Sequence, residues 1–159
     1  MSERRYWLFK SEPDAYSIDD LEADGRTPWD GVRNYQARNF MRDDCKLGDL
    51  VLYYHSNAKP PGVVGLAEVV EESHPDALQF DEESKYYDPK STPDEPRWQL
   101  VDVGFKAKFE RTVSLAELKA DEALDGMLVT MKGQRLSIQP VETHHFDRVL
   151  ELAGYSLAE

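Results

Sequence analysis

The sequence predicts one mixed α/β domain, of the α+β kind, with a curved, mainly antiparallel sheet that closes into a small barrel. Short runs rich in aromatic and β-branched residues, typical of strands, are bounded by turn-forming residues. Capping residues mark short helices between these runs. A chain of 159 residues, of which 40% are apolar, is about one domain with a substantial core. We find no internal repeat and no clean boundary, so residues 1–159 are treated as a single domain.

The N-terminal part is predicted to form a strand and then a short helix. Residues 5–10 are mostly aromatic and apolar, and Pro13 ends this strand because its ring fixes φ and biases the preceding residue. Ser17 is a predicted N-cap followed by acidic residues, and Gly25 closes the helix.

Residues 29–42 place a Trp, a Gly turn and three arginines next to the start of a second predicted helix. Asn34 is a suitable N-cap, since its side-chain oxygen can accept from the first-turn N–H groups. One apolar arc of the helix holds Ala37, Phe40, Met41 and Cys45. Arg38 and Arg42 lie beside that arc, and Trp29 precedes the helix as an exposed-looking side chain. This combination suits a planar or anionic ligand. The alternative is that Trp29 covers the edge of the core and the arginines are solvated.

The remaining elements follow from the same signals. Strands are predicted over 50–55, 63–70, 97–110 and 135–140. A capping box at Ser114 opens one helix, and Thr143 caps the last helix, which ends at Gly154. Gly65 within its strand indicates either a bulge or a place where something approaches the backbone closely. The stretch 71–95 is polar and rich in acids, so it is predicted to be a long surface loop.

The net charge of −12 opposes binding to a long polyanion, because affinity for such ligands grows with the number of phosphates neutralised. Most Lys and Arg residues fall in the segments 33–46, 85–111 and 132–135. We therefore expect a local basic patch on an otherwise acidic protein. Such a patch favours a short, focused contact with an anionic ligand. The alternative is that the acidity reflects adaptation to salt or serves solubility.

The composition also predicts a location. One cysteine excludes an internal disulfide and fits a reducing compartment. No apolar run approaches the ~20 residues that span a bilayer, and Lys10, Glu12 and Asp14 interrupt the only candidate for a signal peptide. We therefore expect a cytoplasmic protein without membrane association.

Seven short motifs occur in an order that resembles one known family. They are WLFKSEP (7–13), WDGVRN (29–34), YYHS (53–56), GVVG (62–65), YDPK (87–90), PRW (96–98) and RLS (135–137). Together they resemble the EVE domain family of the PUA-like superfamily, which includes bacterial stand-alone proteins. The resemblance covers about residues 6–152. It implies a PUA-like β-barrel flanked by helices, with a pocket related to that of YTH domains. It also implies a non-catalytic reader, without a cofactor, that receives a modified base flipped out of DNA or RNA.

Such a reader needs flat walls, polar groups for the base edge and cations for flanking phosphates. The candidate aromatic walls are Trp29, Tyr53, Tyr87 and Trp98. The candidate polar groups are Ser11, Asn34, Ser56 and the backbone around Gly31 and Val32, with Asp88 as a further pocket residue or a turn former. The candidate phosphate-binding residues are Lys10, Arg33, Lys90, Arg97 and Arg135, although Arg135 could instead pair with an acidic residue. Trp98 could equally belong to the core, and Trp7 is expected there. Replacing Trp29 or Trp98 by Ala is expected to abolish base binding and leave the fold intact.

Two other functions are weighed against the reader. An enzyme acting on a modified base or nucleotide would need a titratable group at the pocket floor, and the candidates are His55 and Asp88. An acidic protein-interaction module would bind a basic partner instead. Cys45 is expected to be a buried apolar residue, and no metal site is expected, because His144 and His145 are adjacent and should point apart on a helix.

Overall fold

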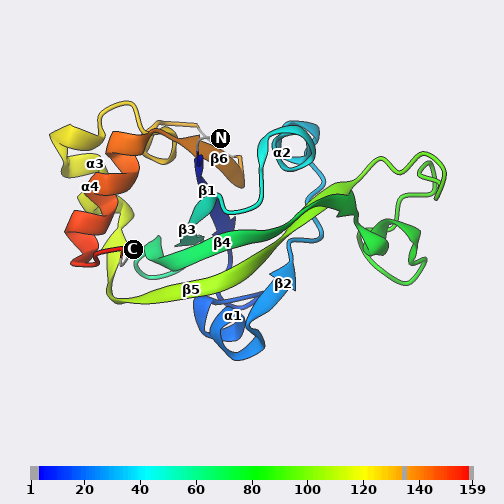
Figure 1. Ribbon diagram of the computed structural model, residues 1–159, viewed down its shortest axis with the longest axis horizontal. Helices are drawn as coiled ribbons and strands as arrows, with labels where there is room; N and C mark the ends of the chain where they lie inside the picture. Colours follow the sequence, from blue (N-terminus) through cyan, green and yellow to red (C-terminus); the bar gives the residue numbers. More distant parts are fainter. Residues whose placement is uncertain (1–3, 134–135, 158–159) are drawn as a thin grey trace.

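The computed structural model describes residues 4–133 and 136–157, and its six strands form one sheet in the order β2-β5-β4-β3-β1-β6 (Figure 1). The strands are β1 (Tyr6–Ser11), β2 (Arg26–Pro28), β3 (Leu50–His55), β4 (Gly62–Pro75), β5 (Gln99–Ser114) and β6 (Ile138–Val141). The α-helices are α1 (Ile18–Asp24), α2 (Tyr35–Asn39), α3 (Leu115–Ala120) and α4 (Thr143–Ala153). This confirms the α+β class. None of the helices in the described part of the chain has the length and apolar composition that a bilayer crossing requires.

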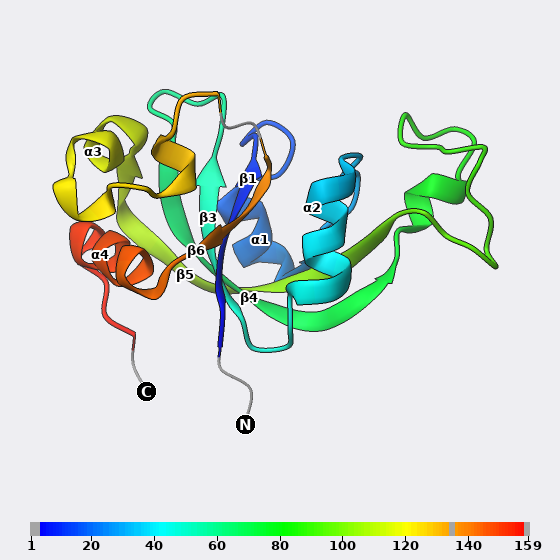
Figure 2. The same cartoon turned by 90° about the horizontal axis from the view of Figure 1, so that it is seen from above.

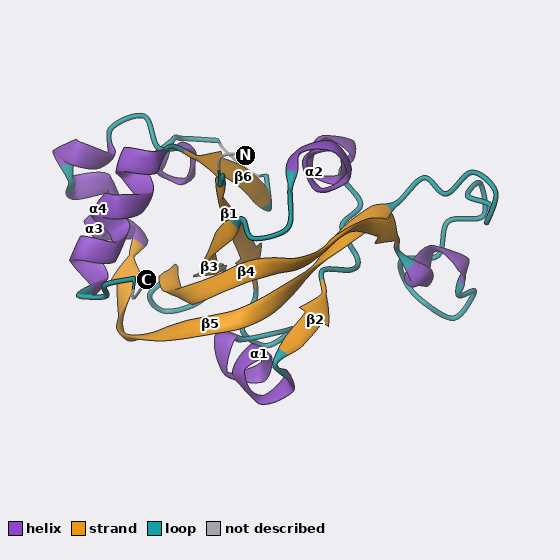
Figure 3. Cartoon of the chain, in the orientation of Figure 1, coloured by secondary structure: helices purple, strands orange, loops and turns teal. Residues whose placement is uncertain are grey.

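The sheet is mainly antiparallel but open. Only the β1–β3 pair is parallel among the pairs of the described chain. The β4–β5 pair carries several register shifts, which increase local twist and curve the sheet (Figure 3). The edge strands β2 and β6 have three and four residues and are not paired with each other in the described ranges. The expected closure into a barrel is therefore wrong, because the two edge strands do not pair with each other and the sheet stays open.

Each face of the sheet packs against different helices. Side chains alternate along a strand, so Trp7 and Phe9 of β1 face one apolar cluster and Leu8 between them faces another. The first cluster contains residues of α1 and α2, and the second contains residues of α3 and α4. Figure 2 shows α3 and α4 together at one end of the sheet and the segment 76–98 projecting from the other end. As expected, Trp7 lies in the core.

Local capping signals locate most helix ends correctly. Ser17 and Ser114 each form the capping box, and Asn34 accepts a hydrogen bond from the backbone N–H of Ala37. Gly154 ends α4 in the left-handed conformation. The prediction for Thr143 is wrong by one residue, because Thr143 is the first helical residue and the N-cap is Glu142, whose side chain makes no capping bond.

The predicted central helix is α-helical only as far as Asn39, the end of α2, and then changes to π-helical hydrogen bonding. One π-helical turn, Phe40–Asp44, follows, and the N–H of Cys45 donates to the carbonyl of Phe40 at 2.8 Å. The predicted apolar arc is buried nonetheless: Ala37 and Met41 are inaccessible and Phe40 packs on the core. Cys45 is the expected buried apolar residue, and burial raises the pKa of its thiol.

The segment 71–95 is more ordered than predicted. Strand β4 runs to Pro75, and a 3-10 turn follows at Ala77–Phe80. Gln79 is inaccessible, and its amide nitrogen donates to the carbonyls of Asp76 and Trp98, both at 2.8 Å. Its amide oxygen accepts from the backbone N–H of Trp98 and the hydroxyl of Ser91. Beyond the end of β4, this segment is therefore held together by the hydrogen bonds of one buried glutamine instead of by strand pairing.

Gly65 meets both expectations stated for it. The register between β4 and its neighbour β5 shifts between Val63 and Gly65. A Cβ on Gly65 would lie 2.4 Å from the carbonyl oxygen of Ala107. The two strands can approach each other here only because the side chain is absent.

Asp49, in the turn before β3, connects the start of β1 to the rest of the sheet. Its side chain is buried and accepts from the N–H of Arg5 at 3.0 Å, the indole of Trp7 at 3.0 Å and the N–H of Lys46 at 2.9 Å. One carboxylate thus satisfies three donors that β1 and the turn leave unpaired.

Asp49→Ala is therefore expected to lower the free energy of unfolding by about 2–4 kcal/mol, because it leaves these donors without an acceptor. Urea denaturation measures this change. The control Asp44→Ala removes a more exposed carboxylate that forms one 3.5 Å ion pair with Arg5, and we expect a decrease of about 1 kcal/mol or less. Equal decreases for the two variants would contradict the assigned role of Asp49.

Candidate functional site

A cavity of about 470 Å³ opens beside Trp29, and we call it the Trp29 cavity. One wall is the continuous segment 28–34. The opposite wall comes from the end of β1 and the turn before α1, and Tyr86 of the projecting segment closes a third side. Ser137, just before β6, also lines the cavity, so four separate parts of the chain meet here.

The structure brings together part of the predicted site. The predicted residues that line the cavity are Lys10, Ser11, Trp29, Val32, Arg33 and Asn34. The predicted residues that lie elsewhere are Tyr53, Ser56, Tyr87, Asp88, Lys90, Arg97 and Trp98. Arg135 lies outside the described residues. The WDGVRN motif and the end of the WLFKSEP motif thus form the site, whereas the YDPK and PRW motifs do not line it.

Trp29 is buried rather than exposed. Only 8% of its surface is accessible, and its ring packs on Phe9 and edge-on against Tyr53, with centroids 5.2 and 5.5 Å away. The indole therefore belongs to the core and presents its remaining surface to the cavity. The expected exposure of Trp29 is therefore wrong, and Trp29→Ala is now expected to destabilise the fold, because removing a buried indole leaves a void.

Gly31 and Asp76 fix the wall next to Trp29. The N–H of Gly31 donates to the buried carboxylate of Asp76 at 2.9 Å, and Gly31 has a φ of +81°. A Cβ at this position would lie 2.9 Å from ring atoms of Tyr86. Glycine is required here both for the backbone conformation and for the space that Tyr86 occupies.

Arg33 acts within the wall. Its Nη1 forms a 3.0 Å ion pair with Asp76, while Nε and Nη2 donate to the carbonyl of Tyr86 at 3.1 and 2.8 Å. The guanidinium also lies 5.3 Å from the centre of the Tyr86 ring and 5.1 Å from that of Trp98. Arg33 therefore joins the projecting segment to the wall, and most of its donors are already used.

Several polar groups at or next to the cavity floor already form hydrogen bonds within the protein. The hydroxyls of Ser11 and Tyr53 both donate to the carbonyl of Tyr16 at 2.7 Å. The hydroxyl of Tyr16 donates to Asp24, and burial together with that carboxylate raises the pKa of Tyr16 to about 12. Ser11 can still accept a hydrogen bond, so the floor offers an oxygen acceptor at the end of β1.

Two further ionisable side chains that line the cavity have shifted pKa values. Burial raises the pKa of the Asp30 carboxyl, and the negative charge of Asp76 raises it further. Burial lowers the pKa of the Lys10 ammonium, which lies 5.9 Å from the centre of the Tyr54 ring. The cavity therefore has one acidic and one basic group at its rim.

Trp98 forms a separate cluster behind Arg33. Its ring stacks on Tyr35 with centroids 4.7 Å apart, and its indole N–H donates to Asp88 at 2.8 Å. That hydrogen bond is the main reason why the pKa of Asp88 is lowered. Arg38 lies 4.7 Å from the Tyr35 ring centre. Trp98 and Asp88 thus support the wall that contains Arg33 from outside the cavity.

Several lining residues were not predicted from the sequence. They are Ala15, Tyr16, Thr27, Pro28, Asp30, Tyr86 and Ser137. Asp30 lies within the WDGVRN motif, and Thr27 and Pro28 directly precede it, so counting the whole motif and its flank as candidates would have found them. Tyr86 and Tyr87 are adjacent, and sequence could not say which one faces inward. Tyr87 remains 37% exposed.

The residues considered for catalysis or metal binding lie outside the cavity. The Nε2 of His55 accepts from the N–H of Ile18 at 3.1 Å, and burial lowers the pKa of this histidine. The expectation that His144 and His145 point apart is wrong. Their ring centroids lie only 4.1 Å from each other in the first turn of α4. With Glu142 they place three possible metal ligands within 4.8 Å of one another. A second such group, Glu71, His74 and Asp102, already binds Arg26.

Comparison with known families places this geometry in context. The model of the EVE domain matches residues 5–152. Human thymocyte nuclear protein 1 is 47% identical over 165 residues, which cover 92% of this chain and 73% of that protein.

Solved structures share the whole fold. A hypothetical protein from Leishmania major has a TM-score of 0.90 and 45% identity, covering 96% of each chain. The human THYN1 protein in complex with DNA containing 5-methylcytosine has a TM-score of 0.88 and 44% identity, covering 96% of this chain and 99% of that one.

The predicted cytoplasmic location is wrong, because the human, mouse and rat relatives are named as nuclear proteins. The prediction rested on a single cysteine and on the expectation of neither a signal peptide nor a membrane span. Thiols stay reduced in both the cytoplasm and the nucleus, so these features do not distinguish the two compartments.

A glycine substitution tests the packing of the cavity wall. Gly31→Ala is expected to destabilise the protein by about 1–2 kcal/mol for the positive φ and by more for displacement of Tyr86. Gly48→Ala is the matched control, since Gly48 has a φ of +92° and a Cβ at this position would meet nothing within 4 Å. Urea denaturation of both variants isolates the contribution of Tyr86. Equal destabilisation would show that Tyr86 does not pack on this wall.

Proposed function

Because the chain belongs to the EVE domain family, we propose that it is a non-catalytic reader that binds a modified base of DNA, flipped into the Trp29 cavity. The observation that carries the proposal is this cavity in a fold that aligns over 96% of its length with human THYN1, a protein solved with DNA containing 5-methylcytosine. The cavity volume of about 470 Å³ lies in the range of small-molecule sites.

Aromatic surfaces supply the first part of the binding energy. Trp29, Tyr16 and Tyr86 line the cavity from three different segments, and Arg33 holds Tyr86 in place. Stacking of a base on an aromatic side chain contributes about 1–3 kcal/mol and tolerates any base. The aromatic walls therefore give affinity, and selectivity must come from other groups.

Hydrogen bonding at the rim supplies selectivity for the base. Acidic side chains accept from the amino group of cytosine, and Asp30 is the lining carboxylate suited to this role. Ser11 offers a further acceptor at the floor. A methyl group in an apolar site is worth only about 1–3 kcal/mol, so we expect a moderate preference for 5-methylcytosine over cytosine.

The charge of the protein limits contact with the DNA backbone. Arg33, one of the predicted phosphate ligands, is engaged by Asp76 and Tyr86, so we assign it to positioning the wall. Lys10 remains at the rim, and no carboxylate of the described residues lies within ion-pair distance of it. An acidic protein with few such cations binds few phosphates, which predicts weak salt dependence.

The geometry supports binding rather than catalysis. A serine nucleophile needs a neighbouring base to take its proton, whereas the Ser11 hydroxyl donates to a backbone carbonyl. The proposed titratable groups of an enzyme, His55 and Asp88, lie outside the cavity and are bonded to Ile18 and Trp98.

Filling the cavity tests the proposal without removing core atoms. Ala15 is an exposed lining residue, and Ala15→Phe is expected to weaken binding to a 5-methylcytosine oligonucleotide at least tenfold by occupying the stacking space. Fluorescence anisotropy measures the affinity for DNA and RNA oligonucleotides that differ only at one central base. Ala23→Phe, on the exposed face of α1 and outside the cavity, is the matched control and should bind as the unaltered protein does.

Base-blind binding, or equal binding by the two phenylalanine variants, would contradict a base site at the Trp29 cavity. Binding only to a basic protein partner would favour the acidic interaction module instead.

The role of Asp30 predicts a pH dependence. Its pKa is raised, so on acidification the carboxylate is lost at a higher pH than that of an ordinary aspartate. If the ionised form accepts from the base, affinity falls on acidification, and the fall begins at a higher pH than an ordinary aspartate, with a pKa of about 3.9, would give. Asp30→Asn should bind more weakly near neutral pH and lose this dependence, whereas Asp14→Asn, an exposed neighbour outside the cavity, should retain it. A pH profile of Asp30→Asn that parallels the unaltered protein would exclude Asp30 as the acceptor.

A further inference from the structure

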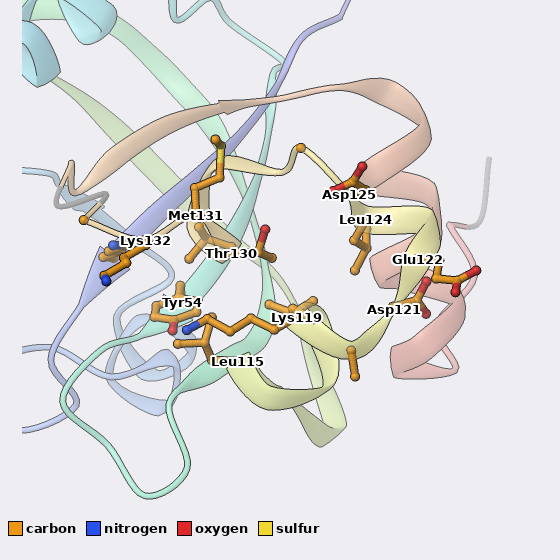
Figure 4. A pocket seen from close by; sticks show the side chains of 16 residues that line it. Tyr54, Leu115, Lys119, Asp121, Glu122, Leu124, Asp125, Thr130, Met131 and Lys132 are labelled. Carbon is orange, nitrogen blue, oxygen red and sulfur yellow. The ribbon is translucent and has the colours of Figure 1, made fainter.

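A second, larger cavity adjoins the first. It measures about 1040 Å³ and lies over Tyr54 between α3 and the segment 124–133, and we call it the Tyr54 cavity (Figure 4). Lys10 lines both cavities, because β1 passes between them. A ligand that extends out of the Trp29 cavity past Lys10 therefore reaches the Tyr54 cavity.

The charges of the Tyr54 cavity are divided between its two ends. Figure 4 shows Lys119 extending toward Tyr54 and Lys132 on the same side, while Asp121, Glu122 and Asp125 lie at the other end. The lysine end is the end that contains Lys10 as well, since Lys10 lies over the Tyr54 ring.

The lysines at this end are free of carboxylate partners. Among the described residues, no carboxylate lies within 4.0 Å of the ammonium of Lys10, Lys119 or Lys132. In contrast, Arg148 at the opposite end is paired with Asp121 at 2.8 Å. Three unpaired cations that converge in a chain of net charge −12 form a local positive field, which attracts an anion.

The floor between the lysines is apolar. Tyr54, Leu118 and Val129 line it and are each less than 10% exposed. A sugar or a base edge can cover such a floor while phosphates contact the ammonium groups above it. A nucleotide chain has this combination of apolar and anionic groups.

We propose that the lysine end of the Tyr54 cavity binds the phosphate backbone of the DNA strand on one side of the base held in the Trp29 cavity. This inference rests on the proposed reader function and adds the path of the strand. The path leaves the Trp29 cavity over Lys10, continues over Lys119 and Lys132, and stays away from the acidic end. Contact with few phosphates agrees with the acidic charge of the whole protein.

The test compares two double variants that each remove two positive charges. Lys119→Ala with Lys132→Ala alters the Tyr54 cavity, and Lys46→Ala with Lys106→Ala is the control outside both cavities. The probes are free 5-methyldeoxycytidine and three single-stranded oligonucleotides with 5-methylcytosine at the 5′ end, the centre or the 3′ end. Affinities are measured at 50 and 200 mM salt, and unfolding curves confirm that both variants fold.

The cavity variant is expected to bind the nucleoside normally. Its affinity for the central oligonucleotide and for one of the two end-labelled oligonucleotides should fall about tenfold or more at 50 mM salt. The slope of log affinity against log salt should also decrease by about 0.7 for each phosphate that the variant no longer neutralises. The control variant should retain both the affinity and the slope.

The other outcomes overturn the inference in distinguishable ways. If the unaltered protein prefers the modified base but both double variants bind alike, the strand does not cross the Tyr54 cavity and the reader function stands. If the cavity variant loses affinity for the free nucleoside, its lysines act on the base site rather than on the backbone. If the unaltered protein does not distinguish the modified base, the reader function fails, and this inference fails with it.

Discussion

The carboxylate of Asp76 is the interaction on which the candidate site depends. Buried at the end of β4, it accepts hydrogen bonds from the N–H groups of Gly31 and Leu78 and from the guanidinium of Arg33. It thereby joins the wall beside Trp29 to the start of the projecting segment 76–98. Removing one partner of a buried ion pair is costly, because the other charge is left without compensation. The shape of the cavity therefore depends on a buried charge that does not itself line the cavity.

This arrangement determines which cations remain for a ligand. Asp76 and the Tyr86 carbonyl use the donors of Arg33, so the arginine of the WDGVRN motif stabilises the wall. The same carboxylate raises the pKa of Asp30 at the rim. One buried charge thus holds Tyr86 as a stacking surface through Arg33 and tunes the acceptor proposed to select the base. Affinity for phosphates must come from lysines that lie further along the surface.

Local signals in the sequence predicted the elements well, and nonlocal contacts limited the prediction of the site. The caps at Ser17, Asn34 and Ser114 are correct because capping depends on residues within one turn. The WDGVRN motif led to half of the cavity because its wall is continuous in sequence. The contribution of Tyr86 depends on Gln79 and Arg33, whose partners lie 19 and 53 residues away. No pattern within the segment 71–95 specifies such contacts.

An acidic chain can bind DNA if the recognised unit is one base with a short length of backbone. Attraction to a polymer scales with the number of phosphates neutralised, whereas stacking and hydrogen bonding in a closed cavity are local and weakly screened. In the proposed reader, the net charge of −12 weakens binding to unmodified DNA, because an unmodified base gains less free energy in the cavity to offset the repulsion. Lys10, Lys119 and Lys132, which have no carboxylate partner among the described residues, lower that repulsion where the strand is proposed to pass. The same acidity that opposes binding to a long polyanion thus acts in favour of selectivity.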